Sequence, residues 1–400
     1  MLASMMMSVG RTLLDIGEGT DHREDADKKE KKVHDALLGL KGKPPFRRTM
    51  PAHHTRKRLF TQEGTGKEDA LPKENAPSRT PPWTTTSRCP IIAEEEGMGY
   101  HDRILHFHVF TGKNMIRVDL HTHTNHSHAR DSVRQMFDAG QARGLLVQGF
   151  SEHSPRPEGY DYPEEYREHL AATFDEYLSE VADLREEQKS RGITVLLGLE
   201  VDWLEDEIPY IRRMTQSHPY DYLIGGIHFL GRWGFDSSAD DWKDLSFEER
   251  CDLYVRYYRT MKSMAETRLF HIVAHPDLIK IFSVDDFHRW LELPASMDLV
   301  GDALTAVRDA GMAMEISSAG LRKSCREIYP GPKILHLARN LGLPITFASD
   351  SHATDQVAWN FDTLARYAAS EGWTESLVFC KGHVTTMPFS AGPLLRPVRE

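Results

Sequence analysis

The chain has 400 residues, of which 40% are hydrophobic, which is enough for one large domain or two ordinary ones with a sizeable core. Its net charge of −11 is uneven, because residues 1–114 carry 19 Lys and Arg against 16 Asp and Glu, whereas residues 115–400 carry 30 against 44. Such an acidic region is a poor match for a nucleic-acid backbone, so we expect no nucleic-acid partner. The four cysteines form no CxxC pair, and no apolar run approaches the roughly 18 residues of a membrane span, so we expect a cytoplasmic protein that neither enters a membrane nor is secreted.

The first 114 residues lack the apolar periodicity of a folded domain. The charged run over residues 24–32 and the Pro/Thr/Ser-rich stretch over residues 77–90 offer too little apolar surface to offset the entropy of ordering. We therefore expect residues 1–114 to be a disordered extension or an over-extended start of the reading frame, since Met115 begins the first well-patterned segment. A regulatory or linker tail is the alternative.

From Met115 onward, short apolar strands alternate with helical stretches, as in a βα-repeat domain. Strands are predicted over residues 116–123, 145–153, 194–203, 220–229, 271–276, 312–317 and 344–352. Between the second and third strands, apolar residues follow helical spacing from Tyr166 to Leu184, and Gly192 is placed to end that helix. Further helices are predicted over residues 132–144, 247–267, 298–310, 332–342 and 356–372. Residues 115–400 are thus predicted to form one α/β domain, a seven-stranded (β/α) barrel.

Side chains that commonly bind metals recur at the ends of these strands. They are His121, His123, His128, His153, Glu200, His228, His275, Asp350 and His352. Because side chains alternate along a strand, His121 and His123 share one face, and so do Asp350 and His352. The C-terminal ends of barrel strands meet at the mouth that carries catalytic groups. A single HxH pair is weak support, but six strand ends repeating this choice predict a polynuclear metal centre.

The motifs resemble those of the PHP (polymerase and histidinol phosphatase) superfamily, and more narrowly its monofunctional histidinol-phosphatases. The matching segments are residues 119–123, 127–129, 151–153, 198–202, 226–229, 274–277, 319–323 and 349–352. The resemblance covers about residues 115–373 and implies a distorted seven-stranded TIM-like barrel with three divalent transition-metal ions, Zn²⁺, Mn²⁺ or Fe²⁺.

The resemblance also implies three ligand sets with Glu200 as a bridge. The first set is His121, His123, Glu200 and Asp350, the second is Glu200, His228 and His275, and the third is His128, His153 and His352. His126 is an alternative to His128, but the family pattern has a histidine before a small residue, which His128 and Ala129 match.

A phosphate monoester is a dianion whose uncatalysed hydrolysis is extremely slow, so a site must neutralise charge and supply a nucleophile. Two ions can hold a hydroxide of lowered pKa, so the expected nucleophile is a metal-bound hydroxide and no protein group. Arg322 is the predicted phosphate clamp, Asp202 is predicted to meet a cationic substrate, and Arg156 is a lesser substrate-binding candidate. Asp119 is read either as the partner of the outer N–H of His121 or as a carboxylate tied to a neighbouring strand.

The resemblance implies a phosphatase that hydrolyses L-histidinol phosphate, a small-molecule phosphate monoester, in histidine biosynthesis. One alternative is a PHP phosphoesterase acting on another small phosphate or on a nucleotide. Another is a non-catalytic PHP module in which metals serve only structure, which missing ligands would favour.

Overall fold

The structure is a computed structural model, and it describes residues 116–161, 166–191, 193–380 and 383–390. These residues all belong to one compact unit of the chain. The predicted extension over residues 1–114 lies outside the described residues, as does Gly192, the predicted helix end. The start of the folded domain at residue 115 therefore stays a prediction.

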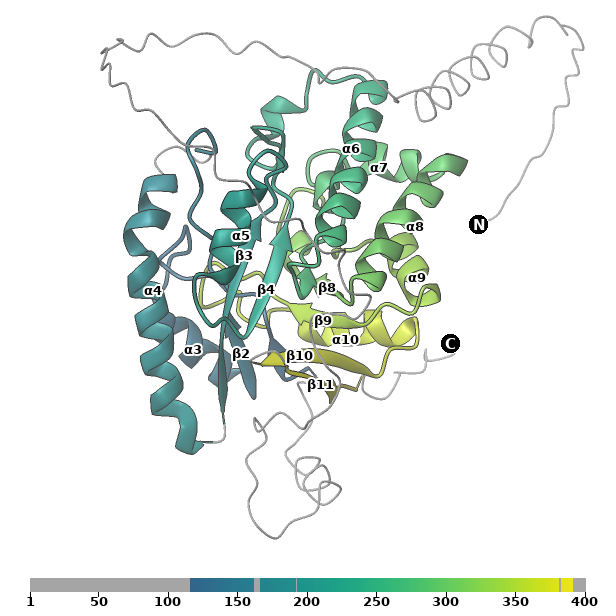
Figure 1. Cartoon of the computed structure of the whole chain (residues 1–400). Helices are drawn as coiled ribbons and strands as arrows, with labels where there is room; N and C mark the ends of the chain where they lie inside the picture. Colours follow the sequence, from purple (N-terminus) through teal and green to yellow (C-terminus); the bar gives the residue numbers. More distant parts are fainter. Residues whose placement is uncertain (1–115, 162–165, 192, 381–382, 391–400) are drawn as a thin grey trace, which may run out of the picture. The chain divides into compact units, whose positions relative to one another are not determined.

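Seven parallel strands form the centre of the described part (Figure 1). In hydrogen-bonded order they are β1 (Val118–Asp119), β2 (Val147–Phe150), β3 (Thr194–Asp202), β4 (Tyr222–Gly226), β7 (Ile272–Val273), β8 (Ala313–Ser317) and β9 (Ile345–Ala348). Backbone hydrogen bonds return the last strand to the first: the Leu120 amide donates to the Phe347 carbonyl at 3.2 Å, and the His123 amide donates to the Ser351 carbonyl at 2.9 Å. The prediction of a seven-stranded α/β barrel is confirmed.

Each of the seven strands lies where it was expected, but five of them end three or four residues before their predicted C-terminal limits, whereas β3 and β8 end within one residue of theirs. The apolar pattern continues into the segments that leave the sheet, so sequence periodicity overestimates the paired length. After β2, for example, the next parallel pairing is an isolated bridge between His153 and Glu200. The segments that carry the candidate ligands are therefore mostly strand ends and the first residues of loops, held by a few hydrogen bonds.

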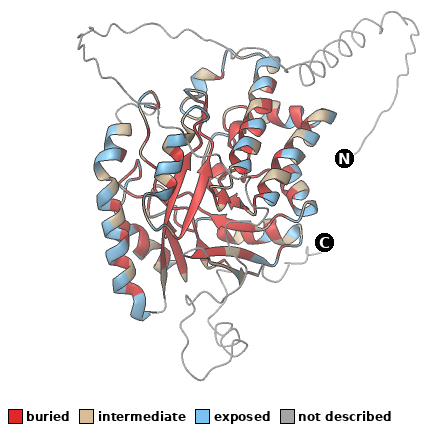
Figure 2. Ribbon diagram, viewed as in Figure 1, coloured by how far each residue is buried: buried red, intermediate tan, exposed pale blue. Residues whose placement is uncertain are grey.

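Helices connect the strands and surround them, with their exposed faces outward (Figure 2). They are α3 (Val133–Ala142), α4 (Tyr166–Gln188), α5 (Ile208–Gln216), α6 (Phe247–Glu266), α7 (Val284–Leu291), α8 (Pro294–Asp309), α9 (Pro332–Asn340) and α10 (Phe361–Ser370). Short 3-10 helices span Lys189–Arg191, Ala239–Asp241, Leu278–Lys280 and Ala319–Leu321. None of the helices in the described ranges is both long and apolar enough to cross a membrane.

Local sequence explains where several helices begin. Ser132 and Ser246 start α3 and α6 with capping boxes, in which each serine hydroxyl accepts a hydrogen bond from the backbone N–H three residues later. α10 begins at Phe361 rather than at the predicted residue 356, because Ala358 and Asn360 adopt left-handed φ values of 48° and 62° that a helix cannot include. Helical periodicity in residues 356–360 was therefore misleading.

Two helices and two hairpins were not predicted. The helices are α5 and α7, which have nine and eight residues. A small hairpin joins β5 (Phe229–Leu230) to β6 (Trp233–Gly234), and a C-terminal hairpin joins β10 (Glu375–Cys380) to β11 (His383–Pro388). The predicted fourth strand ends at Gly226 because Phe229 already belongs to the first of these hairpins.

Candidate metal centre

The nine predicted ligands lie at the ends of six strands and in the turn that precedes α3. They are His121 and His123 after β1, His128 in the turn, His153 after β2, Glu200 in β3, His228 after β4, His275 after β7, and Asp350 and His352 after β9. Seven of them are buried, whereas His352 is half-buried and His128 is exposed. Asp350 and His275 adopt left-handed φ values of 47° and 21°, and such unfavourable backbone geometry is concentrated at functional sites.

Glu200 lies at the centre of this group. Five imidazole nitrogens lie within 3.6 Å of its carboxylate oxygens, those of His121, His123, His153, His228 and His275. Its Oε2 atom is 3.1 Å from His121 Nε2, and its Oε1 atom is 3.1 Å from His275 Nε2. The two oxygens therefore face different histidines, which is the arrangement that a carboxylate shared by two ions requires.

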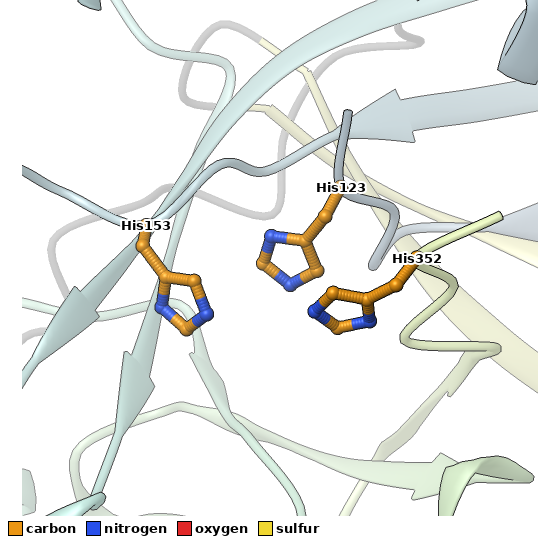
Figure 3. A group of neighbouring side chains, drawn as sticks. All are labelled: His123, His153 and His352. Atoms are coloured by element: carbon orange, nitrogen blue, oxygen red, sulfur yellow. The ribbon is translucent and has the colours of Figure 1, made fainter. Parts of the chain in front are cut away.

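Three sets of side chains bring their ligand atoms within 4.8 Å of one another. They are His121 with His123 and Glu200, His153 with Glu200 and His228, and His123 with His153 and His352. Figure 3 shows the last set, in which the His123 ring centroid lies 4.6 Å from that of His153 and 4.5 Å from that of His352. The predicted ligands thus come together, whereas their division among three ions stays a prediction.

The structure separates the two alternative histidines in the turn before α3. The ring centroid of His128 lies 4.2 Å from that of His352 and 5.4 Å from that of His153. By contrast, the buried His126 ring lies against α4, where its Nε2 atom is 3.2 Å from a carboxylate oxygen of Glu180. This placement supports His128 over His126 as the candidate ligand.

The outer nitrogens of two histidines meet buried carboxylates. Glu315 in β8 accepts a hydrogen bond from His121 Nδ1 at 2.7 Å, and Asp202 accepts one from His228 Nδ1 at 2.6 Å. Such partners fix the orientation and tautomer of an imidazole. Glu315 was not singled out from the sequence, although it is the one charged residue in the apolar run 312–317. A lone carboxylate in a buried strand needs a polar partner, and that signal would have identified it.

Asp119 does not contact the outer nitrogen of His121, so the first interpretation of this residue is wrong. Its Oδ1 atom accepts a hydrogen bond from the Ser349 amide at 3.0 Å, and its Oδ2 atom accepts one from the Ala358 amide at 3.1 Å. Asp119 therefore ties β1 to the segment after β9, which agrees with the alternative interpretation of a carboxylate bound to a neighbouring strand.

Two buried glutamates contact the segment that follows β1. Besides its contact with His121, Glu315 lies 3.3 Å from the His275 amide, so one carboxylate joins the segments after β1 and β7. Glu152 accepts hydrogen bonds from the backbone amide and the hydroxyl of Thr124, and its other oxygen is 3.5 Å from His123 Nδ1. Both contacts restrict the positions of the candidate ligands.

The two predicted substrate-binding arginines differ in their partners. Arg156 is buried and directs Nε to Asp202 Oδ2 at 2.6 Å, between the rings of Tyr166 and Phe229. Arg322 is half-buried and uses Nη2 to donate to the carbonyls of Ser349 and Asp350, whereas its buried Nη1 has no hydrogen-bond partner among the described residues.

Comparison with known proteins decides the family. The model of the PHP domain matches residues 119–319 of this chain. The chain belongs to the PHP domain family. The matched region contains seven of the nine candidate ligands, and Asp350 and His352 follow it.

Relatives within the PHP domain family carry related names. A Deinococcus radiodurans protein named probable histidinol-phosphatase is 32% identical over 246 residues, which cover 61% of this chain and 89% of that protein. The histidinol-phosphatase of Bacillus subtilis is 27% identical over 265 residues, covering 59% and 92%. A crystal structure of histidinol phosphate phosphatase from Lactococcus lactis, in complex with zinc, L-histidinol and phosphate, has a TM-score of 0.55 at 18% identity, covering 67% of this chain and 98% of that chain. This last likeness concerns the fold.

Burial and nearby charge divide the imidazoles of this PHP domain into two kinds. Burial lowers the pKa of His123, but contacts with Asp350 and two glutamates outweigh it and raise the pKa to about 10. Burial likewise opposes the carboxylates around His228, which raise its pKa to about 9. Burial and neighbouring imidazoles hold the pKa of His352 well below its ordinary value. Carboxylates thus draw positive charge into one part of the site, and a divalent cation can replace those protons.

The donor set fits divalent transition metals. Imidazole and carboxylate groups suit Zn²⁺, Mn²⁺ and Fe²⁺. Within the described ranges, two of the candidate ligands have a buried imidazole nitrogen that lacks a hydrogen-bond partner, His275 Nδ1 and His352 Nε2. Because a buried polar atom without a partner is costly, these nitrogens are consistent with a site built to hold cations.

Proposed function

We propose that the chain is a metal-dependent phosphomonoesterase that hydrolyses L-histidinol phosphate to L-histidinol and phosphate in histidine biosynthesis. The observation that carries the proposal is the placement of Glu200 among five imidazoles at the end of a barrel. The names of relatives that match most of their own length to this chain supply the substrate. A cytoplasmic location is proposed from the dispersed cysteines alone.

The nine candidate ligands would hold up to three divalent ions, with Glu200 shared between two of them. When bound, such ions neutralise the phosphate dianion and lower the pKa of water, so that no protein nucleophile is needed. Glu315 and Asp202 would keep His121 and His228 in the orientation that presents Nε2 to the cluster. The residues of the chain thus prepare the geometry before substrate arrives.

Arg322 is our candidate for the phosphate clamp. Its Nη2 atom is fixed by two carbonyls at the end of β9, at 2.8 and 3.0 Å, and its Nη1 atom is left to donate to a phosphoryl oxygen. One of those carbonyls belongs to the candidate ligand Asp350, so the guanidinium lies beside the metal cluster. A guanidinium fixed in this way stabilises developing charge without reorganising.

Asp202 has two candidate roles. The sequence suggests contact with the amine of the substrate, with Arg156 as a further substrate-binding residue. In the structure, however, both carboxylate oxygens of Asp202 already have partners, His228 Nδ1 and Arg156 Nε, each at 2.6 Å. We therefore favour Asp202 as the residue that orients His228, with Arg156 balancing its buried charge.

The test is an assay of the purified full-length protein with its metal content measured in parallel. We expect more than one divalent transition-metal ion per chain, and a higher kcat/KM for L-histidinol phosphate than for phenyl phosphate, glycerol phosphate or a nucleoside monophosphate. Metal-loaded protein that hydrolyses none of these would contradict the proposal. A preference for another monoester would retain the phosphatase and change its substrate.

A further inference from the structure

Trp359 is a large apolar side chain that the barrel leaves in solvent. With 37% of its surface exposed, it is the one large hydrophobic residue that is exposed in the described part of the chain. It lies in the segment between β9 and α10, which also carries Asp350 and His352. Single exposed apolar residues are common, so its exposure needs support from its surroundings before it indicates a role.

The backbone on both sides of Trp359 is held in an unfavourable conformation. Ala358 and Asn360 have φ values of 48° and 62°, although neither is glycine. The Ala358 amide donates to the buried carboxylate of Asp119 at 3.1 Å, and the Trp359 amide donates to the Gln356 carbonyl at 3.0 Å. Asparagine adopts left-handed φ values readily, but an alanine in this conformation persists only where surrounding contacts enforce it. The chain therefore fixes where this indole lies.

The indole lies against the guanidinium of Arg322. The guanidinium carbon is 5.5 Å from the centroid of the Trp359 ring, within the range of a cation–π contact. Asp119 also accepts a hydrogen bond from the Ser349 amide, and the Ser349 carbonyl accepts one from Arg322 Nη2. One buried carboxylate thus fixes both the segment that holds Nη2 and the segment that presents the indole.

We propose that Trp359 is a positioning residue for Arg322, holding the guanidinium so that Nη1 is directed to a phosphoryl oxygen of the substrate. The proposal rests on the proposed function, and within it on the clamp role of Arg322. An arginine side chain has several rotatable bonds, and two carbonyls bind only one of its terminal nitrogens. A ring against the guanidinium restricts the remaining rotation and excludes water from that side. The Arg322 side chain then loses less conformational entropy when phosphate binds.

The experiment is a double-mutant cycle with Trp359→Ala and Arg322→Ala in the metal-loaded, full-length protein. We expect Trp359→Ala to lower kcat/KM by roughly three- to thirtyfold, the range of a partly desolvated cation–π contact, and by the same factor for L-histidinol phosphate and phenyl phosphate. Trp359→Phe should recover most of the loss, because phenylalanine keeps a ring in place. In the Arg322→Ala background, Trp359→Ala should change kcat/KM by less than about twofold, since its target is gone.

A second readout is the dissociation constant of inorganic phosphate, measured by calorimetry on the same four proteins. Trp359→Ala should raise this dissociation constant when Arg322 is present, and it should leave the constant unchanged in the Arg322→Ala background. Arg339→Ala is the matched control, because it removes another arginine–tryptophan contact, in which the Arg339 guanidinium lies 5.4 Å from the centroid of the Trp373 ring. Trp373 donates a hydrogen bond to the carbonyl of Leu343, which precedes β9, so this pair lies at the opposite end of that strand from Asp350. This variant should leave kcat/KM and phosphate binding unchanged.

Several results would overturn the proposal. Additive losses in the cycle would show that Trp359 acts independently of Arg322, and a loss confined to L-histidinol phosphate would make the indole a contact for the organic part of the substrate. No loss on Trp359→Ala would leave the residue without a role in the reaction. Failure of the proposed function is distinct, because the unchanged protein would then not hydrolyse L-histidinol phosphate, whereas phosphate binding would still report on the pair.

Discussion

Glu315→Gln tests whether the buried carboxylate in β8 prepares the metal centre. Glu315 uses one oxygen to accept from His121 Nδ1 at 2.7 Å, and the other lies 3.3 Å from the His275 amide. Glutamine has nearly the same shape but only one acceptor, so its NH₂ group must face one of these two donors. Either the His121 ring or the His275 backbone then loses its partner.

The expected cost follows from what such partners contribute to metal sites. Removing the residue that orients a metal-binding histidine commonly lowers metal affinity or activity by about 10- to 100-fold, equal to about 1.4 to 2.7 kcal/mol. We expect Glu315→Gln to fall in this range and to affect tight metal retention before it affects folding. Metal content after dialysis against a chelator of known affinity measures the first effect, and circular dichroism measures the second.

The control is Glu371→Gln, which removes a histidine–carboxylate contact of similar length, 2.9 Å to His336, at a more exposed position. It should leave metal content and kcat/KM as they are. If Glu315→Gln keeps full metal affinity and full kcat/KM, the contact with His121 has no role in preparing the site. If both variants lose metal equally, the effect is one of general stability.

Three further predictions concern the bridge, the second carboxylate and the tail. Glu200→Gln removes the charge at the centre of five imidazoles, so turnover should fall by several orders of magnitude and metal stoichiometry should drop while the fold survives; near-normal activity would exclude a bridge. Asp202→Asn should lower kcat/KM equally for L-histidinol phosphate and phenyl phosphate if it orients His228, whereas a loss confined to the aminated substrate would restore the amine contact. A chain that starts at Met115 should be as active and as metal-rich as the full chain, and aggregation of this shorter protein would place part of residues 1–114 in the fold.

The candidate ligands could be identified from the sequence because each is a local signal. His153 and His275 are polar residues at the ends of apolar strands, and parallel strands bring such ends together whatever the details of packing. The pattern of the whole set therefore predicted the barrel and the gathering of these side chains at one end of it, whereas the binding of metal by them stays a prediction. Their division among ions depends on distances of a few ångströms, which no spacing in the sequence contains.

The partners of those ligands could not be predicted in the same way. Glu315 is separated from His121 by 194 residues, and which carboxylate faces which ring depends on the stagger of the strands. Asp119 shows the consequence, because strand alternation placed it beside His121, whereas its carboxylate turns to the backbone of Ser349 and Ala358. Likewise, the helical spacing before Phe361 predicted too early a start for α10, because it gives no sign of the left-handed backbone at Ala358 and Asn360.

The closure between the first and last strands has a consequence for stability. Few backbone hydrogen bonds cross it, yet candidate ligands stand on both sides, with His123 Nε2 3.4 Å from a carboxylate oxygen of Asp350. An ion bound by both residues would cross-link the first and last strands of the barrel, much as a disulfide does, but reversibly. A ligand that binds only the folded, closed barrel stabilises it by mass action. The concentration of free metal would therefore set the free energy of unfolding of the barrel as well as its activity.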